Sequence, residues 1–216
     1  MPTIVGLRRR GYTPEALRLF CERTGVSKNN ARIDYSLLDQ ALREVQDPVA
    51  PRSVAILDPL KLVITNFPEG HVEPCQAPRN PHDPQAGQRQ FGFTRELWIE
   101  QEDFAEVPPP KYFRLFPGNS ARLKYGYVVT CTGFVKDASG KVTEVHAEYN
   151  PDTKSGTAGS NAGKVKGTVT WISAVQAIPA EIRLYDRLFS QPFPDAGDND
   201  FLTCLNPNSV QSVMAW

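Results

Sequence analysis

The sequence predicts an α+β protein, with a short N-terminal helical region followed by a mainly antiparallel β-barrel or sandwich. Two observations carry this assignment. The first 50 residues combine helix start signals with apolar residues at helical spacing. Residues 53–180 instead hold short β-branched runs separated by turn residues. With 216 residues, 40% of them hydrophobic, the chain can form one sizeable domain or two small ones.

Two helices are expected in the first region. Thr13 is a suitable N-cap because Pro14 and Glu15 follow it, and the apolar spacing then continues to Gly25. A second amphipathic stretch begins after Asp34 and stops before Pro48. A polar, exposed loop over residues 26–30 would join the two helices into an αα-hairpin.

The second region is expected to be built from short strands. The candidate strands are 54–57, 60–64, 96–100, 127–130 and 165–171, and a hairpin is expected with strands 132–135 and 142–149. Residues 150–163 are rich in Gly, Ser, Asn and Ala, which predicts a loop. Residues 181–189 alternate charged and apolar side chains, and the apolar Val213, Met214 and Trp216 near the end are expected to be exposed.

Composition and motifs exclude several classes of protein. No run of about 18 apolar residues could span a membrane, and the first residues lack the apolar core of a secretory signal, which indicates a cytoplasmic protein with no membrane partner. The four cysteines lie singly, so we expect packing residues and no metal site. No nucleotide-binding or hydrolase motif is present, and the carboxylate pair Glu102-Asp103 is expected to be solvated. No catalytic residue is predicted.

Charge is segregated along a chain whose net charge is zero. Residues 53–108 hold four Lys or Arg and nine Asp or Glu, whereas residues 109–170 hold nine and four. Within the basic block, Arg122, Lys124 and Gly126 would share one face of a strand, opposite Leu123, Tyr125 and Tyr127. Such a row of cations could bind unstacked RNA bases if it is not buried against carboxylates. The alternative is an ordinary solvated barrel face.

Several blocks, in the same order, resemble one family of enzymes. The blocks are Met1-Pro2-Thr3-Ile4, Gly6 to Thr13, Ala50-Pro51-Arg52, Asp58 to Ile64, Lys164 to Gly167 with Trp171, and Glu181 to Phe189. Together they resemble the C-terminal half of bacterial glutaminyl-tRNA synthetases. Glutamyl-tRNA synthetases of the non-bacterial type share the barrel but resemble these blocks less closely.

The resemblance implies a division of labour within a longer protein. It implies a helical subdomain at 1–50, an anticodon-binding β-barrel at 51–180, and a connector with the incomplete start of a second barrel at 181–216. Met1 would then follow directly on an upstream catalytic domain, which carries the signatures for ATP. This chain would recognise glutamine tRNA without activating glutamine, it would need no cofactor, and ATP and Mg would serve only the full-length enzyme. A monomer is expected.

The resemblance also implies roles for single residues. It places Arg52 at the middle anticodon base, Arg114 at the third base, and Arg122 and Lys124 at the first base, with Lys111 beside them. Lys124 stands where the most similar family members have Arg, so a bidentate contact there is lost. Lys28 and Asn29 would approach the inner side of the tRNA's L. The alternatives are a free-standing barrel that binds structured RNA, a glutamyl-tRNA synthetase fragment, and a protein-interaction sandwich that uses the apolar C-terminal residues.

Overall fold

The computed structural model describes residues 1–216 except 1–2, 30, 32, 162–164 and 198–199. The chain forms two compact units. One unit contains Met1–Arg52 and Pro78–Gln88, and the other contains Ser53–Ala77 and Arg89–Trp216. The first unit therefore includes residues 78–88, which are separated in sequence from the helical region.

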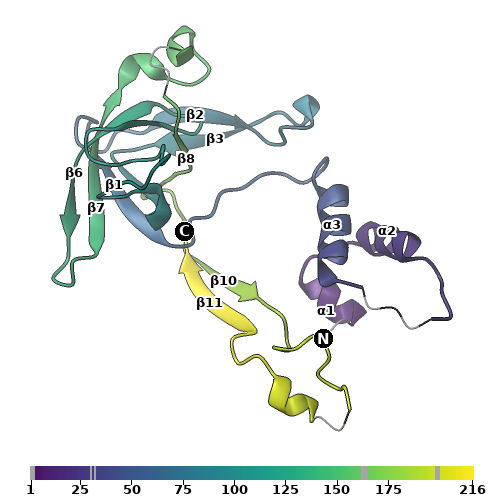
Figure 1. Ribbon diagram of the computed structural model, residues 1–216. Helices are drawn as coiled ribbons and strands as arrows, with labels where there is room; N and C mark the ends of the chain where they lie inside the picture. The colour runs from purple at the N-terminus through teal and green to yellow at the C-terminus, as the bar shows by residue number, and fades with distance from the viewer. Residues whose placement is uncertain (1–2, 30, 32, 162–164, 198–199) are drawn as a thin grey trace. The chain divides into compact units, whose positions relative to one another are not determined.

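Helices form most of the first unit (Figure 1). In the described part of the chain the α-helices are α1 (Ile4–Arg9), α2 (Pro14–Thr24) and α3 (Tyr35–Gln46). The two expected helices are confirmed with their caps, because the side chain of Thr13 accepts a hydrogen bond from Ala16 N at 3.3 Å and Asp34 accepts one from Ser36 N at 2.8 Å. The sequence analysis did not predict α1. Asn30, at the end of the expected loop, lies outside the described residues.

The helices share a small core that polar contacts extend. Ala16 of α2 and Ala41 of α3 are fully buried, which lets the two helices approach closely. The hydroxyl of Tyr12 donates a hydrogen bond to Asp39 of α3, and burial together with this bond raises the Tyr12 pKa. The guanidinium of Arg10 lies over the rings of Tyr12 and Tyr35, at 5.7 and 5.3 Å from their centroids.

A curled seven-stranded sheet dominates the second unit (Figure 1). Its strands, in spatial order, are β8 (Thr168–Val169), β5 (Ser120–Leu123), β6 (Val128–Lys136), β7 (Val142–Asn150), β1 (Pro59–Ile64), β4 (Glu96–Glu100) and β9 (Ile172–Ser173). The pairs β1–β7 and β5–β8 are parallel, and the other pairs are antiparallel. The α+β class with a mainly antiparallel sheet is therefore confirmed, as is the β6–β7 hairpin.

Aromatic side chains fill the concave side of this sheet. Phe93, on a strand beside it, packs within 6 Å, between ring centroids, of Phe67, Tyr127, Tyr149 and Trp171. Phe93 is fully buried, and Phe67, Tyr127 and Trp171 are almost so. Alternation along β1, where Leu60, Leu62 and Ile64 are buried, brings aliphatic side chains to the same core. The core includes Ala121 and Leu123 of β5, the strand that carries the candidate site residue Arg122.

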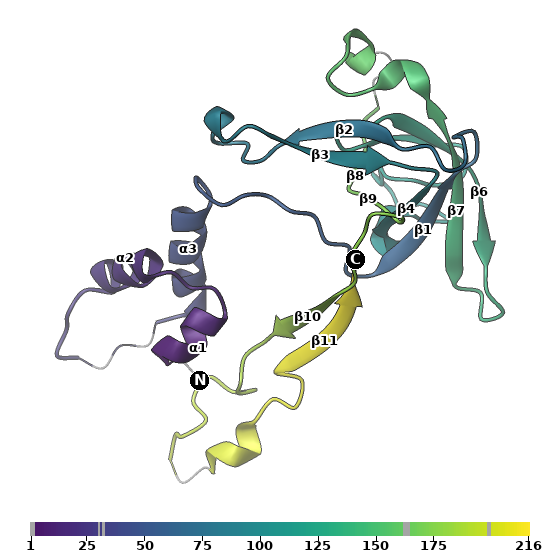
Figure 2. The same ribbon diagram turned by 180° about the vertical axis from the view of Figure 1, so that it is seen from behind.

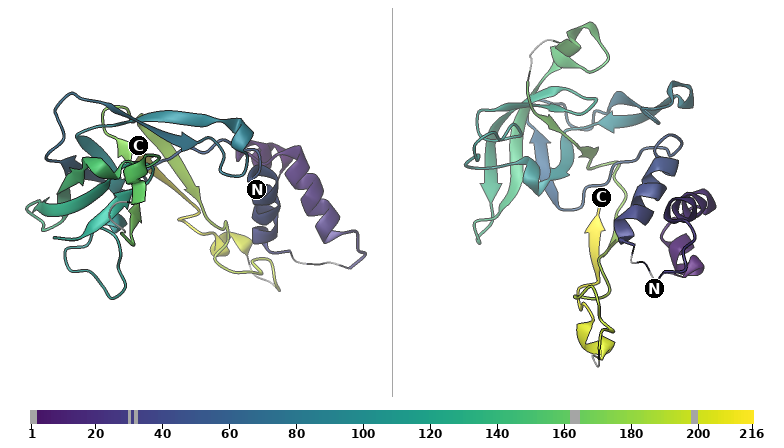
Figure 3. Two further views of the ribbon diagram at one scale, coloured as in Figure 1. Left: turned by 90° about the horizontal axis from the view of Figure 1, so that it is seen from above. Right: turned by 45° about the vertical axis from the view of Figure 1, so that its right-hand side comes forward.

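Two two-stranded sheets accompany the seven-stranded sheet. β2 (Glu73–Pro78) and β3 (Gln88–Phe93) lie side by side (Figure 2), and η1 (Pro84–Ala86) lies between them in sequence. β10 (Ala180–Tyr185) pairs antiparallel with β11 (Val210–Ala215) (Figure 3). The remaining short 3₁₀ segments of the described chain are η2 (Gln101–Asp103), η3 (Pro151–Thr153), η4 (Ala158–Asn161) and η5 (Phe201–Cys204).

Several sequence predictions about strands and exposure are wrong. Residues 54–57 form no strand, and Ile56 instead exchanges two main-chain hydrogen bonds with Trp216, of 2.7 and 3.0 Å. Trp216 is half-buried and stacks on Trp98 with ring centroids 5.9 Å apart, so it is not the exposed residue that we expected. Cys21 is exposed, whereas the other three cysteines are buried as packing residues. Of the helices described, none has the length and apolar character needed to cross a bilayer.

Candidate nucleic-acid interface

A short segment around Gly167 brings three of the predicted site residues together. The N–H of Arg122 donates to Gly167 O at 2.9 Å, and the N–H of Lys124 donates to Val169 O at 2.9 Å. On its other side Gly167 packs on the main chain before Arg114, so closely that a Cβ at position 167 would lie 1.6 Å from Phe113 O. Only glycine fits there. Residues 167–169 therefore connect the segments that carry Arg114, Arg122 and Lys124.

Two carboxylates hold the side chain of Arg114. Its Nη1 donates a hydrogen bond to Glu102 Oε1 at 2.7 Å and lies 2.8 Å from Asp103 Oδ1. The hydrogen bond to Glu102 raises the pKa of Arg114, so the guanidinium stays charged. The side chain of Arg114 remains 40% exposed. Arg114 is thus paired with carboxylates but not buried by them.

Asp103 does not behave as the solvated carboxylate that the sequence suggested. It lies in η2 and is only 4% exposed, so the prediction of a surface pair at Glu102-Asp103 is wrong for Asp103. Burial raises the pKa of Asp103 to about 6, against an opposing effect of Arg114. The neighbouring Tyr112 is also affected, since burial raises its pKa to about 12. Negative charge at Asp103 therefore depends on the cation beside it.

Arg122 is held by main-chain and hydroxyl oxygens instead. Its Nη1 donates to Thr153 O at 2.9 Å and to Ser155 Oγ at 3.3 Å, and its Nη2 donates to Ser160 O at 2.7 Å. These acceptors belong to the glycine-rich stretch that the sequence predicted as a loop, part of which forms η3 and η4. Residues 162–164 of that loop lie outside the described residues. One guanidinium therefore fixes both ends of the segment from 153 to 160.

The expected row of cations along one strand is wrong. β5 ends at Leu123, and Lys124 lies in a turn in which Tyr125 adopts a left-handed conformation with φ of 62°. Gly126 is buried, whereas the alternation had placed it on the exposed face with Arg122. Lys124 is exposed, its Nζ lies 5.6 Å from the Tyr125 ring centroid, and its carbonyl accepts a hydrogen bond from Trp171 Nε1 at 2.9 Å. The turn, not the strand, determines where Lys124 points.

Lys111 is exposed and lies in a turn. Its φ of 65° is unusual for a residue other than glycine. The turn is closed by a hydrogen bond from Tyr112 N to Pro109 O at 3.1 Å. This conformation fixes the main chain just before Arg114.

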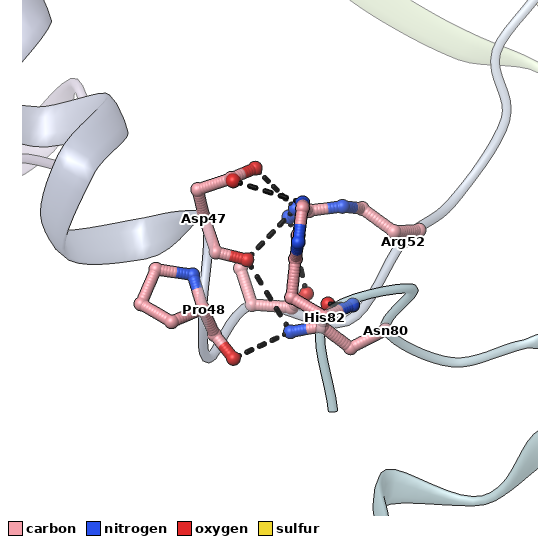
Figure 4. A network of polar contacts seen from close by, with 6 residues as sticks. Asp47, Pro48, Arg52, Asn80 and His82 are labelled. Atoms are coloured by element: carbon pink, nitrogen blue, oxygen red, sulfur yellow. Dashed lines mark hydrogen bonds and ion pairs between the residues drawn. The ribbon is translucent and has the colours of Figure 1, made fainter. Parts of the chain in front are cut away.

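Arg52 belongs to the other unit, where it forms a polar network (Figure 4). Its guanidinium pairs with the Asp47 carboxylate and donates to Asp47 O at 2.8 Å. The second carboxylate oxygen of Asp47 lies 3.0 Å from His82 Nε2. Asn80, which is 2% exposed, donates to Pro48 O at 2.6 Å and accepts from His82 N at 2.9 Å. The network places the Arg52 side chain, 33% exposed, against the main chain that follows α3.

Lys28 and Asn29 are exposed in the segment between α2 and α3. The N–H of Asn29 donates to Ser27 Oγ at 3.1 Å, which is a local turn contact. These two residues and Arg52 lie in the first unit, whereas the four other predicted cations lie in the second.

Sequence reasoning missed one cation of the second unit. Lys166 is exposed, and its Nζ lies 5.4 Å from the ring centroid of Phe113, a side chain that is 47% exposed. Lys166 directly precedes Gly167 in the sequence, so it adjoins the same segment, but the sequence alone does not show the close approach of Gly167 to Phe113. Lys166 therefore joins Arg114, Arg122 and Lys124 around the Gly167 segment.

The part of the chain that the structure describes brings together no three His, Cys, Asp or Glu side chains that could hold a metal ion. The residues that adjoin the Gly167 segment instead carry guanidinium and ammonium groups, and the ammonium groups of Lys124 and Lys166 lie near the rings of Tyr125 and Phe113. Groups of this kind bind phosphates and stack on unpaired bases.

Comparison with known proteins agrees with this chemistry. Two family profiles match, both described as the anticodon-binding domain of class I tRNA synthetases (E and Q), at residues 50–150 and 168–216. Over all 216 residues the chain is 72% identical to a glutamine–tRNA ligase of Bordetella pertussis, 61% to one of Ralstonia pickettii and 60% to one of Cupriavidus metallidurans. It spans 37 or 38% of the length of these relatives. The chain belongs to the anticodon-binding domain family of the class I synthetases for glutamate and glutamine.

Proposed function

We propose that this chain binds the anticodon loop of glutamine tRNA, as the recognition part of a glutamine–tRNA ligase. The relatives that match the whole chain carry that enzyme's name, which favours glutamine over glutamate. The observation that carries the proposal is the convergence of Arg114, Arg122 and Lys124 on one short segment. Cations held by a well-packed main chain can contact the edges of bases that have left their helix.

The proposal assigns each cation a base. Arg52 reads the middle base, Arg114 the third, and Arg122 with Lys124 the first. Lys111 adds positive charge beside Arg114. A well-placed Arg contact contributes about 1–3 kcal/mol of discrimination between bases. Lys28 and Asn29 meet the inner side of the tRNA's L from the helical unit.

In the complete enzyme this binding would serve a reaction that takes place elsewhere. The proposed division is a helical subdomain at 1–50, the anticodon-binding barrel at 51–180, and a connector with the start of a second barrel at 181–216. A catalytic domain upstream would attach glutamine with ATP and Mg, in the cytoplasm and as a monomer. Anticodon binding would act on that site as a coupling free energy.

A binding titration tests the proposal. The 216-residue chain is titrated against glutamine tRNA and against transcripts with one anticodon base replaced, at one fixed salt concentration. We expect each replacement to weaken binding by roughly tenfold or more. Equal affinity for all transcripts would refute the proposal.

The matched control is Lys141→Ala. Lys141 is an exposed cation of the β6–β7 turn, so its loss changes the net charge without touching the Gly167 segment. We expect this variant to keep the full preference for the cognate anticodon. The chain alone should also show no glutamine-dependent pyrophosphate exchange, and robust exchange would contradict the location of the chemistry upstream.

A further inference from the structure

We propose that Asp103 is a positioning residue for anticodon recognition. It fixes the Arg114 guanidinium in one orientation, with Nη1 held by carboxylates and the edge formed by Nε and Nη2 left for a base. The inference rests on the proposed function and adds to it a residue that contacts no RNA. It is carried by contacts around Arg114 that do not involve any other predicted site residue.

The main chain that directly follows Arg114 is hydrogen-bonded to η2 and to the segment after it. The N–H of Leu115 donates to Asp103 O at 2.9 Å, and the N–H of Ala105 donates to Leu115 O at 3.0 Å. The carbonyl of Arg114 itself accepts a hydrogen bond from Asn119 Nδ2 at 2.7 Å. The backbone of Arg114 therefore has a fixed place relative to the Asp103 carboxylate.

The two carboxylates beside Arg114 differ in burial. The side chain of Asp103 is 6% exposed, and that of Glu102 is 75% exposed. A long exposed side chain such as Glu102 moves with its partner, whereas a buried carboxylate cannot follow a moving guanidinium. Of the two carboxylates, Asp103 therefore has the more fixed position, and Glu102 makes the second contact with Arg114 Nη1 from the solvent side.

A buried carboxylate needs a reason, since replacing a whole buried ion pair by apolar side chains of similar volume is often neutral or stabilising. Desolvation opposes the charge of Asp103, as its raised pKa shows. The negative charge of Asp103 instead orients the Arg114 guanidinium, because it attracts Nη1 of this planar group to one position. The hydrogen bond to Glu102 and the contact with Asp103 both use Nη1 of Arg114, not the edge formed by Nε and Nη2. This edge carries two parallel donors, which match a base edge with two neighbouring acceptors.

The test separates positioning from a merely structural role. Asp103→Asn keeps the volume but removes the charge. The measured quantity is the ratio of affinities for glutamine tRNA and for a transcript with the third anticodon base replaced, with a middle-base transcript in parallel. We expect the third-base ratio of the 216-residue chain to fall roughly tenfold and the middle-base ratio to stay unchanged. The Asp103→Asn variant should require at least as much denaturant as the wild type to unfold at pH 8.

Two further variants keep the test decisive. Glu102→Gln changes an exposed side chain, so it cannot unfold the chain, and it should lower the third-base ratio by about two- to threefold. Glu106→Gln removes a different exposed ion pair, with Lys136 at 2.6 Å, and should leave both ratios unchanged.

The inference is overturned if Asp103→Asn keeps the third-base ratio, lowers affinity equally for every transcript, or unfolds at pH 8. A wild-type chain with no preference for any base overturns the proposed function and this inference together. A wild type that discriminates, with loss in Arg114→Ala but none in Asp103→Asn, refutes only the positioning role.

Discussion

Arg114 and Arg122 stand near the same Gly167 segment, yet the protein holds them in different ways. Acidic side chains bind Arg114, so its charge is largely cancelled locally. Neutral oxygens of Thr153, Ser155 and Ser160 bind Arg122, so its charge remains. The difference shows two separate roles for an arginine, which are to offer donors in a fixed orientation and to attract a negatively charged ligand. Arg114 supplies a directed fork with little net charge, whereas Arg122 supplies net positive charge and also organises a loop.

Gly167→Ala should have the largest effect, because it breaks the segment that both arginines share. The added Cβ would meet Phe113 O at 1.6 Å, so the main chain on one side must move. We expect a loss of about 3 kcal/mol in the free energy of unfolding. Denaturant unfolding followed by tryptophan fluorescence, to which the buried Trp171 contributes, measures it.

Gly133→Ala is the control for that substitution, since no atom lies within 4 Å of the Cβ that it would add. Its unfolding free energy should change by less than about 1 kcal/mol. Equal losses in the two variants would show that the close approach of Gly167 to Phe113 is not needed.

Arg122→Ala should rank second, since it removes the proposed base contact and the hydrogen bonds to residues 153–160. We expect tRNA binding to weaken by about 2 kcal/mol, with the largest loss of discrimination at the first anticodon base. Amide hydrogen exchange in 153–160 should become faster. Arg122→Lys keeps the charge but lacks the fork, so it should restore general affinity without the loop protection. Unchanged exchange in the alanine variant would contradict the tether.

The ionisation of Asp103 gives a smaller effect that depends on pH. Its pKa is raised from 3.8 to about 6, so its contribution to stability is complete below pH 3.8 and is lost as pH rises through 6. Relative to Asp103→Asn, the wild type should therefore lose about 1–3 kcal/mol of unfolding free energy between pH 4 and pH 7. Denaturant unfolding of both proteins across this range measures the difference. Parallel stability curves would show that Asp103 is not desolvated.

Lys124→Arg should have the smallest effect and the opposite sign. Lys124 is exposed in the turn after β5, where an arginine would offer a planar fork in place of a single ammonium group. We expect tighter binding to cognate tRNA by about 0.5 kcal/mol, with unchanged stability. A titration against first-base transcripts measures it. Weaker binding would mean that the ammonium group itself is required at this position.

The elements that the sequence predicted correctly are those with local signals. Thr13 and Asp34 cap their helices through contacts two or three residues away, and the β6–β7 hairpin turns through Asp137 and Gly140. Short-range rules of this kind do not need the rest of the fold. The expectation of tRNA recognition came from the family resemblance of several sequence blocks, because the basic and aromatic residues alone left a solvated barrel face open.

The errors concern features that tertiary packing decides. Alternation placed Lys124 on a strand, but Tyr125 takes a left-handed conformation that its sequence does not demand. Asp103 was expected to be exposed to solvent because the neighbouring sequence gives no sign that Leu115 and Arg114 contact it in the fold. Contacts between residues that are distant in sequence leave no local sequence pattern, so these buried contacts of Asp103 could not be predicted.

The main-chain bonds between Ile56 and Trp216 have a consequence for the order of folding. Nearly the whole second unit lies between these two residues in sequence, and the parallel pairing of β1 with β7 also joins distant segments. Contacts between residues so far apart in sequence require the loop-closure entropy to be lost before the contacts contribute favourable free energy. The β6–β7 hairpin should therefore form early, while Ile56 and Trp216 meet among the last events of a slow search.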